Sequence, residues 1–165
     1  MASRVDRPSA RVVVVDDTRN VLLFQIVDAL DAKPPVWITP GGGIEPGETI
    51  AVAAARELYE ETGAVVDPGA LGAPVAVCRG EWEFRGVPLY SVDWFFGLRV
   101  PTFEPSEEGW EDLERDLHAS WRWWPVAELD ESPGVILPSG LSHVVQNIFD
   151  GRVFSEPIEL PWVAV

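Results

Sequence analysis

A short segment in the first half of the chain restricts the fold more than any other feature. Trp37-Ile38-Thr39 precedes Pro40, and the residue before a proline is held in an extended conformation. This pattern predicts a strand that runs directly into the glycine loop Gly41-Gly42-Gly43. Glycine lacks a side chain, so the backbone of this loop can come close to a metal ion or a phosphate group.

A helix with signals at both ends follows the glycine loop. Thr49 is a suitable N-cap, and Ile50–Thr62 is rich in Ala, Leu and Glu. Gly63 stands where a left-handed C-cap residue belongs. We therefore predict a helix over residues 50–62.

Three glutamates share one face of this helix. Glu57, Glu60 and Glu61 are related by spacings of three and four residues, which places their side chains on one patch. Like charges at these spacings destabilise a helix by roughly 0.2–0.5 kcal/mol per pair. A divalent cation with oxygen ligands would compensate them, whereas the alternative is a solvated acidic face. Arg56 is the nearby cation, and its guanidinium can donate a bidentate hydrogen bond to Glu48, which would hold the loop against the helix.

The segment from Gly42 to Ala64 resembles the signature box of the Nudix hydrolase family. The match consists of Gly42, five residues, Glu48, seven residues, then Arg56-Glu57-Leu58-Tyr59-Glu60-Glu61-Thr62-Gly63-Ala64. Only the last position departs from the usual pattern, because Ala64 is smaller than the bulky aliphatic residue expected there. The resemblance implies an α/β fold, an α/β/α sandwich with a mixed β-sheet, and hydrolysis of a nucleoside diphosphate derivative with Mg²⁺ or Mn²⁺.

The same resemblance assigns roles to residues of the box. Glu57 and Glu61 correspond to the principal metal ligands, and Glu60 to a ligand or the catalytic base. Arg56 would orient Glu57, with Gly42 and Glu48 as structural support of the site. The backbone carbonyl of the glycine before the box, here Gly41, is a further expected metal ligand.

An acidic stretch downstream is a candidate for one more catalytic carboxylate. Glu107, Glu108 and Glu111 lie in a segment that we expect to be a mobile loop, and enzymes of this family often supply a carboxylate from such a segment. We choose Glu108 as the catalytic candidate. The alternative is a solvated loop without a function in the site.

The rest of the chain predicts further strands and one more helix. We expect a hairpin from Arg11–Val15 and Val21–Val27, strands at Val75–Cys78, Glu81–Phe84, Tyr90–Val100 and Trp121–Trp123, a helical turn at Val126–Leu129 and a helix at Ser142–Asp150. The length of 165 residues favours a single domain over residues 1–165, with residues 1–10 flexible and residues 153–165 as a C-terminal extension. This extension packs on its own domain or forms the arm of a homodimer.

Charge and cysteine content exclude several classes of function. Asp and Glu number 27 against 12 Lys and Arg, and the net charge of −15 repels polyanions and anionic lipids. We therefore expect a small-molecule nucleotide substrate, with neither a nucleic-acid polymer nor a membrane as partner. The single cysteine, Cys78, excludes an intramolecular disulfide framework, and no stretch has the roughly 18 apolar residues of a membrane span. These features predict a cytoplasmic protein.

Several other residues have two interpretations. Cys78 is expected to be a core residue rather than a nucleophile, and His118 and His143 are expected to have surface or capping roles rather than to bind a metal. Trp121, Trp123 and Trp124 fill the core or offer a platform for stacking a base.

The resulting functional hypothesis is a metal-dependent hydrolase that directs water at a phosphorus atom of a pyrophosphate linkage. Its substrate class includes nucleoside triphosphates, damaged nucleotides and nucleotide sugars. The alternative is a nucleotide-binding or sensing module of the same fold without turnover. The box with Arg56, Glu57, Glu60 and Glu61 all present favours the enzyme.

Overall fold

The structure is a computed structural model that describes residues 4–26, 35–84, 86–110, 112, 115, 118–132 and 134–163. The strands are β1 (Val5–Val15), β2 (Asn20–Ile26), β3 (Val36–Ile38), β4 (Gly41–Gly43), β5 (Ala76–Phe84), β6 (Val87–Arg99), β7 (His118–Pro125), β8 (Val135–Leu137) and β9 (Ile158–Leu160). The helices are α1 (Ile50–Thr62), α3 (Val126–Leu129) and α4 (Leu141–Phe149), with a 3₁₀ turn, η2, at Pro68–Leu71.

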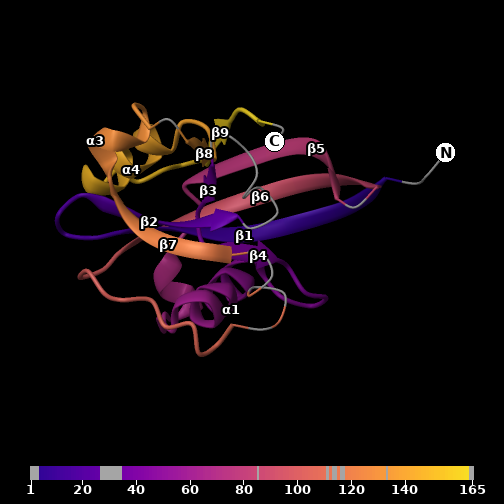
Figure 1. Ribbon diagram of the computed structural model, residues 1–165, viewed down its shortest axis with the longest axis horizontal. Coiled ribbons are helices and arrows are strands. Elements are labelled where there is room, and N and C mark those ends of the chain that lie inside the picture. The colour runs from indigo at the N-terminus through magenta and orange to yellow at the C-terminus, as the bar shows by residue number, and fades with distance from the viewer. Residues whose placement is uncertain are drawn as a thin grey trace.

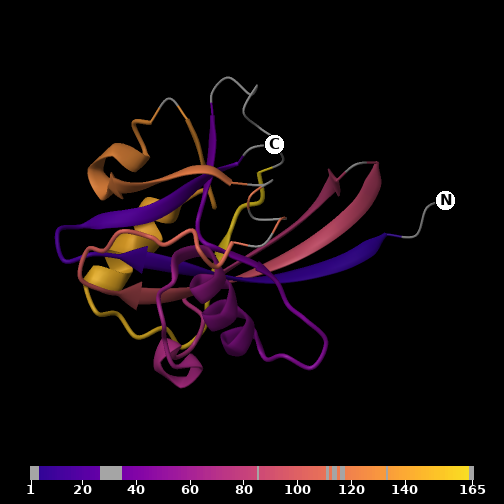
Figure 2. The same ribbon diagram turned by 60° about the horizontal axis from the view of Figure 1, so that its bottom comes forward.

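Within the described ranges, the strands form one mixed sheet. Its order is β8-β3-β2-β1-β6-β5-β9, with β4 paired to β1 and β7 paired to β2. β1 and β6 run parallel, whereas β1–β2 and β5–β6 are antiparallel. Helix α1 covers one face of the sheet, and α3 and α4 cover the other (Figures 1 and 2). The predicted α/β/α sandwich with a mixed sheet is confirmed.

Strand β1 explains why the core has two halves. The side chains of Val12–Val15 are all fully buried, and successive ones belong alternately to the cluster around α1 and the cluster around α4. A continuous apolar run is the pattern expected of a strand that is covered on both faces. On α1, Ala53 and Ala54 are fully buried beside Leu58, so small side chains bring this helix close to the sheet.

The structure differs from the sequence prediction at several strands, and the sequence does not predict the strands β8 and β9. β1 begins at Val5, inside the segment predicted to be flexible, because its first residues pair with β6. β5 is one continuous strand rather than two, because its residues pair with β6 throughout. Gly80 lies within it, and a side chain at this position would overlap the indole ring of Trp162. The glycines predicted as a loop form β4, which pairs with β1.

The C-terminal segment packs on its own domain, as one of the two interpretations predicted. β9 pairs in parallel with β5, and Leu160 is buried in the cluster around α4. The indole Nε1 of Trp162 donates a hydrogen bond to the carbonyl of Glu81 at 3.1 Å. The tail therefore closes one edge of the sheet.

The structure places the cysteine, the three tryptophans and one of the two histidines for which the sequence allowed two roles. Cys78 is buried in the core, and so is Trp124, whereas Trp121 and Trp123 pack partly buried against the cluster around α1. His143 is exposed, with its Nε2 atom 3.2 Å from the Asn147 side-chain amide. The side chain of His118 lies outside the described part of the chain. None of the helices in the described ranges is long and apolar enough to cross a membrane.

Candidate active site

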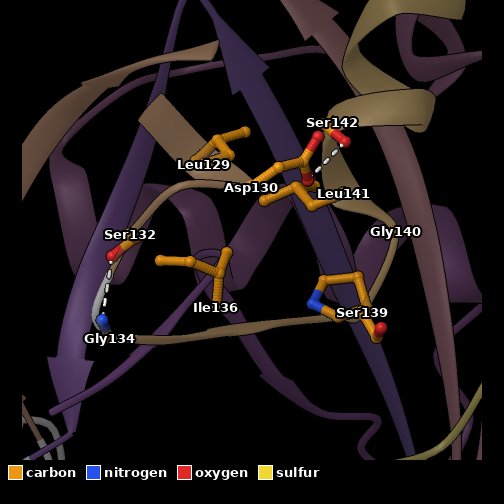
Figure 3. Close-up of a pocket in the computed structure, with 10 residues that line it drawn as sticks. Leu129, Asp130, Ser132, Gly134, Ile136, Ser139, Gly140, Leu141 and Ser142 are labelled. Carbon is orange, nitrogen blue, oxygen red and sulfur yellow. Dashed lines mark hydrogen bonds between the residues drawn. The ribbon is translucent and has the colours of Figure 1, made fainter. Parts of the chain in front are cut away.

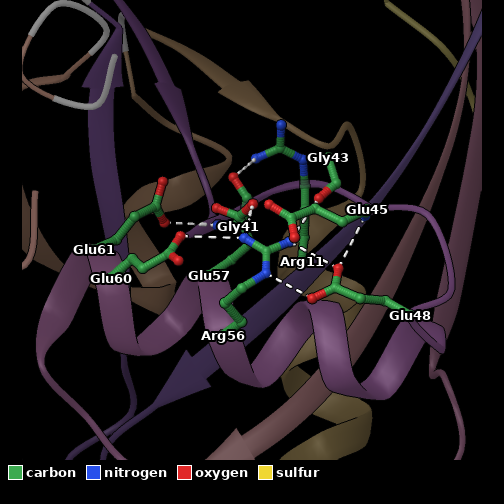
Figure 4. A network of polar contacts seen from close by, with 9 residues as sticks. All are labelled: Arg11, Gly41, Gly43, Glu45, Glu48, Arg56, Glu57, Glu60 and Glu61. Carbon is green, nitrogen blue, oxygen red and sulfur yellow. Dashed lines mark hydrogen bonds and ion pairs between the residues drawn. The ribbon is translucent and has the colours of Figure 1, made fainter. Parts of the chain in front are cut away.

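A hollow beside α4 is not the site that the sequence predicts. It has a volume of about 190 Å³ and lies between α3, β8 and the start of α4 (Figure 3). The helices α3 and α4 lie on the opposite side of the sheet from α1 (Figure 1). Small-molecule sites usually occupy roughly 300–1,000 Å³. Its polar groups also bond to one another: Ser142 donates to Asp130 at 2.8 Å, and the amide of Gly134 donates to Ser132 at 3.0 Å. The candidate active site is instead the carboxylate cluster between α1 and β4 (Figure 4).

Helix α1 has the ends that its sequence predicts. The Thr49 hydroxyl accepts a hydrogen bond from the amide of Val52 at 3.2 Å, which makes Thr49 the N-cap. Gly63 has φ 75°, and its amide donates to the carbonyl of Tyr59 at 2.8 Å. Both ends follow from local capping chemistry, so the positions of the glutamates along the helix are fixed by short-range sequence signals.

Arg56 ties the helix to the loop before it. Its Nε and Nη2 atoms donate to the two carboxylate oxygens of Glu48 at 2.7 and 2.9 Å, which confirms the predicted bidentate pair. Nη1 donates to Glu57 at 2.9 Å and to Glu60 at 3.2 Å, and Nη2 also donates to the carbonyl of Gly43 at 3.0 Å. The hydrogen bond from Arg56 lowers the pKa of Glu48 to about 2, and the same bond is the largest cause of the raised pKa of Arg56.

Glu57 and Glu61 are buried carboxylates, with exposed fractions of 8% and 2%. Burial, and then the nearby Glu61 carboxylate, raises the pKa of Glu57 to about 7, although Arg56 acts in the opposite direction. Burying like charges together is costly unless a cation compensates them. Within the described ranges, the single guanidinium of Arg56 is shared by the carboxylates of Glu48, Glu57 and Glu60.

The glycines of β4 make room for these carboxylates. The amide of Gly41 donates to Glu61 Oε2 at 2.7 Å. A Cβ atom on Gly42 would lie 2.6 Å from Glu57 Oε2, closer than real atoms approach. An alanine at position 42 would therefore force the Glu57 carboxylate to move.

The donor set fits a hard divalent cation, although the side chains are not arranged around one. Carboxylate and carbonyl oxygens are the ligands that Mg²⁺ and Mn²⁺ prefer. Among the described residues, no group of three or more His, Cys, Asp or Glu side chains stands in a metal-coordinating arrangement. Glu57 is turned toward Arg56, and Glu61 toward the amide of Gly41. A cation would therefore bind with a rearrangement of these side chains.

The acidic stretch, which the sequence predicts to be a mobile loop, contacts the end of α1 through Ser106 and Trp110. The amide of Ser106 donates to the carbonyl of Thr62 at 2.8 Å, and the indole of Trp110 donates to the carbonyl of Glu61 at 2.7 Å. The Trp110 ring packs edge-on against Phe24, with ring centroids 6.0 Å apart. These contacts hold the loop beside the helix that carries the glutamates.

Three acidic residues of this stretch were candidates. Glu107 and Glu108 are exposed, and the amide of Glu108 lies 3.3 Å from the Ser106 hydroxyl. Glu111 lies outside the described residues. The loop places Glu108 near the end of α1, and its role in catalysis stays a prediction.

Arg11 is a residue of this site that the sequence does not predict. Its Nη1 atom donates to the carbonyl of Thr39 at 2.9 Å and lies 3.4 Å from the carbonyl of Gly41. The one signal in the sequence is a charged residue directly before the apolar run Val12–Val15. Its proximity to Gly41 depends on the pairing of β1 with β4, which local sequence does not reveal.

The chain is similar to known proteins of one family. The profile of the NUDIX domain matches residues 5–140. An RNA pyrophosphohydrolase of Caulobacter vibrioides is 35% identical over 131 residues, which cover 73% of this chain and 73% of that protein. An RNA pyrophosphohydrolase of Bradyrhizobium diazoefficiens is 36% identical over 116 residues, covering 62% of this chain and 65% of that protein.

Solved structures show the same fold at lower sequence identity. A MutT NUDIX hydrolase from Burkholderia pseudomallei superposes with a TM-score of 0.60 at 20% identity, covering 87% of this chain and 98% of that one. A NUDIX hydrolase from Nitrosomonas europaea gives a TM-score of 0.59 at 18% identity, covering 90% and 92%. Since the domain profile spans most of the chain and the relatives at 35% identity are pyrophosphohydrolases, this protein belongs to the Nudix family and is a Nudix pyrophosphohydrolase.

Proposed function

We propose that this enzyme uses Mg²⁺ or Mn²⁺ to cleave the pyrophosphate linkage of a nucleoside diphosphate derivative. The observation that carries this proposal is the buried pair Glu57 and Glu61, held between Arg56 and the amide of Gly41. Nudix hydrolases generally use divalent metals. A bound divalent cation would neutralise phosphate charge and lower the pKa of water.

The residues have separate roles in this proposal. Glu57 and Glu61 are the principal metal ligands, with the carbonyl of Gly41 as a further ligand. Glu60, or Glu108 from the anchored loop, accepts the proton of the attacking water. The new bond forms between the water oxygen and phosphorus, and the anhydride bond from phosphorus to its bridging oxygen breaks.

Arg56 is a positioning residue in this scheme. Its contacts with Glu48 and Gly43 fix the guanidinium, and its contacts with Glu57 and Glu60 then fix the carboxylates. Glu48 and Gly42 support the site, the first by holding Arg56 and the second by leaving room for Glu57.

Two substrate classes compete for this site. The net charge of −15 favours a free nucleotide, such as a nucleoside triphosphate, a damaged nucleotide or a nucleotide sugar. The names of the relatives at about 35% identity favour RNA. Because a polyanion would meet a strongly acidic surface, we propose the free nucleotide as the substrate and RNA as the second candidate.

Hydrolysis of a substrate panel tests both parts of the proposal. Nucleoside triphosphates, oxidised nucleotides, nucleotide sugars and a short 5′-triphosphorylated RNA would each be incubated with Mg²⁺, Mn²⁺ or excess EDTA. We expect turnover of a free nucleotide that requires the cation. Undiminished turnover in EDTA contradicts the metal mechanism, preference for the RNA contradicts the substrate class, and nucleotide binding without turnover supports the sensing module.

A further inference from the structure

We propose that Arg11 binds a phosphate oxygen of the substrate. We further propose that its positive charge weakens the binding of a metal cation at the carbonyl of Gly41. This inference rests on the proposed function, because it places the pyrophosphate of the substrate at the carboxylate cluster. It concerns a residue that lies outside the Nudix box, on strand β1.

The backbone of Gly41 holds Arg11 in place. Arg11 pairs with Gly41 across strands β1 and β4. Gly41 has φ 140°, and a Cβ atom there would lie 2.7 Å from Cγ of Arg11. The missing side chain therefore lets the arginine lie across the glycine, where Nη1 reaches the carbonyls of Thr39 and Gly41.

The same glycine connects Arg11 to the carboxylate cluster. The carbonyl of Gly41 faces Arg11, and its amide donates to Glu61 at 2.7 Å. Figure 4 shows Arg11 and Arg56 approaching Gly41 and Glu57 from different sides. A pyrophosphate bound at Glu57 and Glu61 would therefore lie within reach of the Arg11 guanidinium.

Arg11 can still donate hydrogen bonds to a ligand, whereas the guanidinium of Arg56 already donates to carboxylates of the protein. Three carboxylates contact Arg56, those of Glu48, Glu57 and Glu60. The hydrogen bonds of Arg11 within the described ranges go to neutral carbonyls through Nη1, and its ion pair with Asp93 is long, at 3.8 Å. The Nη2 group donates to no described residue, and the side chain is 20% exposed. A guanidinium in this state can form the paired hydrogen bonds that phosphate oxygens accept.

Arg11 also affects the cation. The carbonyl of Gly41 is the expected backbone ligand of the metal, and in this structure it lies within hydrogen-bond distance of Arg11. The positive charge of the Arg11 guanidinium beside this carbonyl weakens the attraction of the carbonyl oxygen for a metal cation. Loss of the Arg11 charge should therefore weaken phosphate binding and leave cation binding equal or tighter, whereas a structural support would weaken both.

Two binding measurements on the full-length protein test this inference. The affinity for Mn²⁺ alone would be measured by electron paramagnetic resonance, and the affinity for inorganic pyrophosphate with saturating Mg²⁺ by calorimetry. For Arg11→Gln we expect pyrophosphate to bind about 10- to 100-fold more weakly, the range of one hydrogen bond to a charged group, with Mn²⁺ affinity unchanged or higher. Arg11→Lys, which keeps the charge but loses the planar fork, should fall between wild type and Arg11→Gln.

Arg99→Gln is the matched control, because Arg99 lies at the end of β6, is 51% exposed and pairs with Asp17. It should bind both probes like the wild type.

Equal pyrophosphate affinity in Arg11→Gln and wild type would overturn the inference, and so would parallel loss of both affinities. A wild-type protein that binds neither Mn²⁺ nor pyrophosphate would instead contradict the proposed function. If Arg11→Gln fails to fold, the Arg11→Lys comparison decides.

Discussion

At the scale of single residues, the site depends on glycines as much as on glutamates. Gly42 faces the Glu57 carboxylate, whereas the neighbouring Gly43 has nothing within 4 Å of the position of a Cβ atom. The two positions are adjacent in one short strand and differ mainly in this contact. They therefore offer a matched pair for testing the packing around Glu57.

Gly42→Ala should reduce activity much more than Gly43→Ala. The added methyl group would displace the Glu57 carboxylate, and a misplacement of about 1 Å at a catalytic group can cost on the order of 10²-fold in rate. Steady-state kinetics with saturating Mg²⁺ would measure kcat for both variants, and circular dichroism would confirm their folds. Equal kcat values for the two alanine variants would show that Glu57 tolerates displacement.

Glu48 should make stability depend on acid pH. The folded protein lowers the pKa of Glu48 from 4.5 to about 2, so the fold favours the ionised carboxylate. This stabilisation is fully present above pH 4.5 and is lost as the pH falls toward 2, with a magnitude on the order of 2 kcal/mol. Urea unfolding of wild type and Glu48→Gln in EDTA should show a difference at pH 7 that shrinks by pH 3. Glu83→Gln, an exposed substitution on β5, is the control, and a pH-independent difference for Glu48→Gln would refute the prediction.

At the scale of elements, local signals predict helix α1 and nonlocal pairing decides the rest of the site. The N-cap Thr49 and the C-cap Gly63 act within one turn of the helix, so the sequence alone gives its bounds. β4 exists because the glycines pair with β1, and β5 continues through Gly80 because this residue pairs with Ser91 on β6. The residues of the box could be predicted because they follow one another along the chain. Arg11 and the anchor of the acidic loop could not, because they reach the site through contacts between distant segments.

The indole of Trp110 should matter to catalysis because it anchors the acidic loop to α1. Trp110→Phe keeps an aromatic ring next to Phe24 but loses the hydrogen bond to the Glu61 carbonyl. The control is Trp82→Phe, which loses an indole hydrogen bond of 2.8 Å to the Ser91 hydroxyl on strands β5 and β6. Each variant should lose about 1 kcal/mol of stability. Only Trp110→Phe should lower kcat, by about tenfold, with little change in KM. Equal kcat in the two variants would mean that the anchor has no effect on the reaction.

At the scale of the whole molecule, the protein combines a net charge of −15 with a buried pair of carboxylates, yet belongs to a family that hydrolyses anionic substrates. The acidic surface disfavours approach of phosphate groups. A divalent cation bound at the cluster would offset the repulsion between the acidic protein and the phosphate groups. It would also stabilise the folded state, because it binds to the folded state and not to the unfolded chain. Metal-dependent hydrolysis would therefore reconcile the acidic surface with an anionic substrate.

The most direct test is kcat and thermal unfolding of Glu57→Gln and Glu61→Gln, with and without saturating Mg²⁺. Each variant should lose about 10²-fold or more in kcat, the scale of one electrostatic contact to the transition state. Without metal, melting temperatures should equal or exceed that of the wild type, because the substitution removes repulsion between buried carboxylates. The rise in melting temperature that Mg²⁺ causes in the wild type should disappear. Near wild-type kcat in both variants, with the Mg²⁺ response intact, would contradict the account.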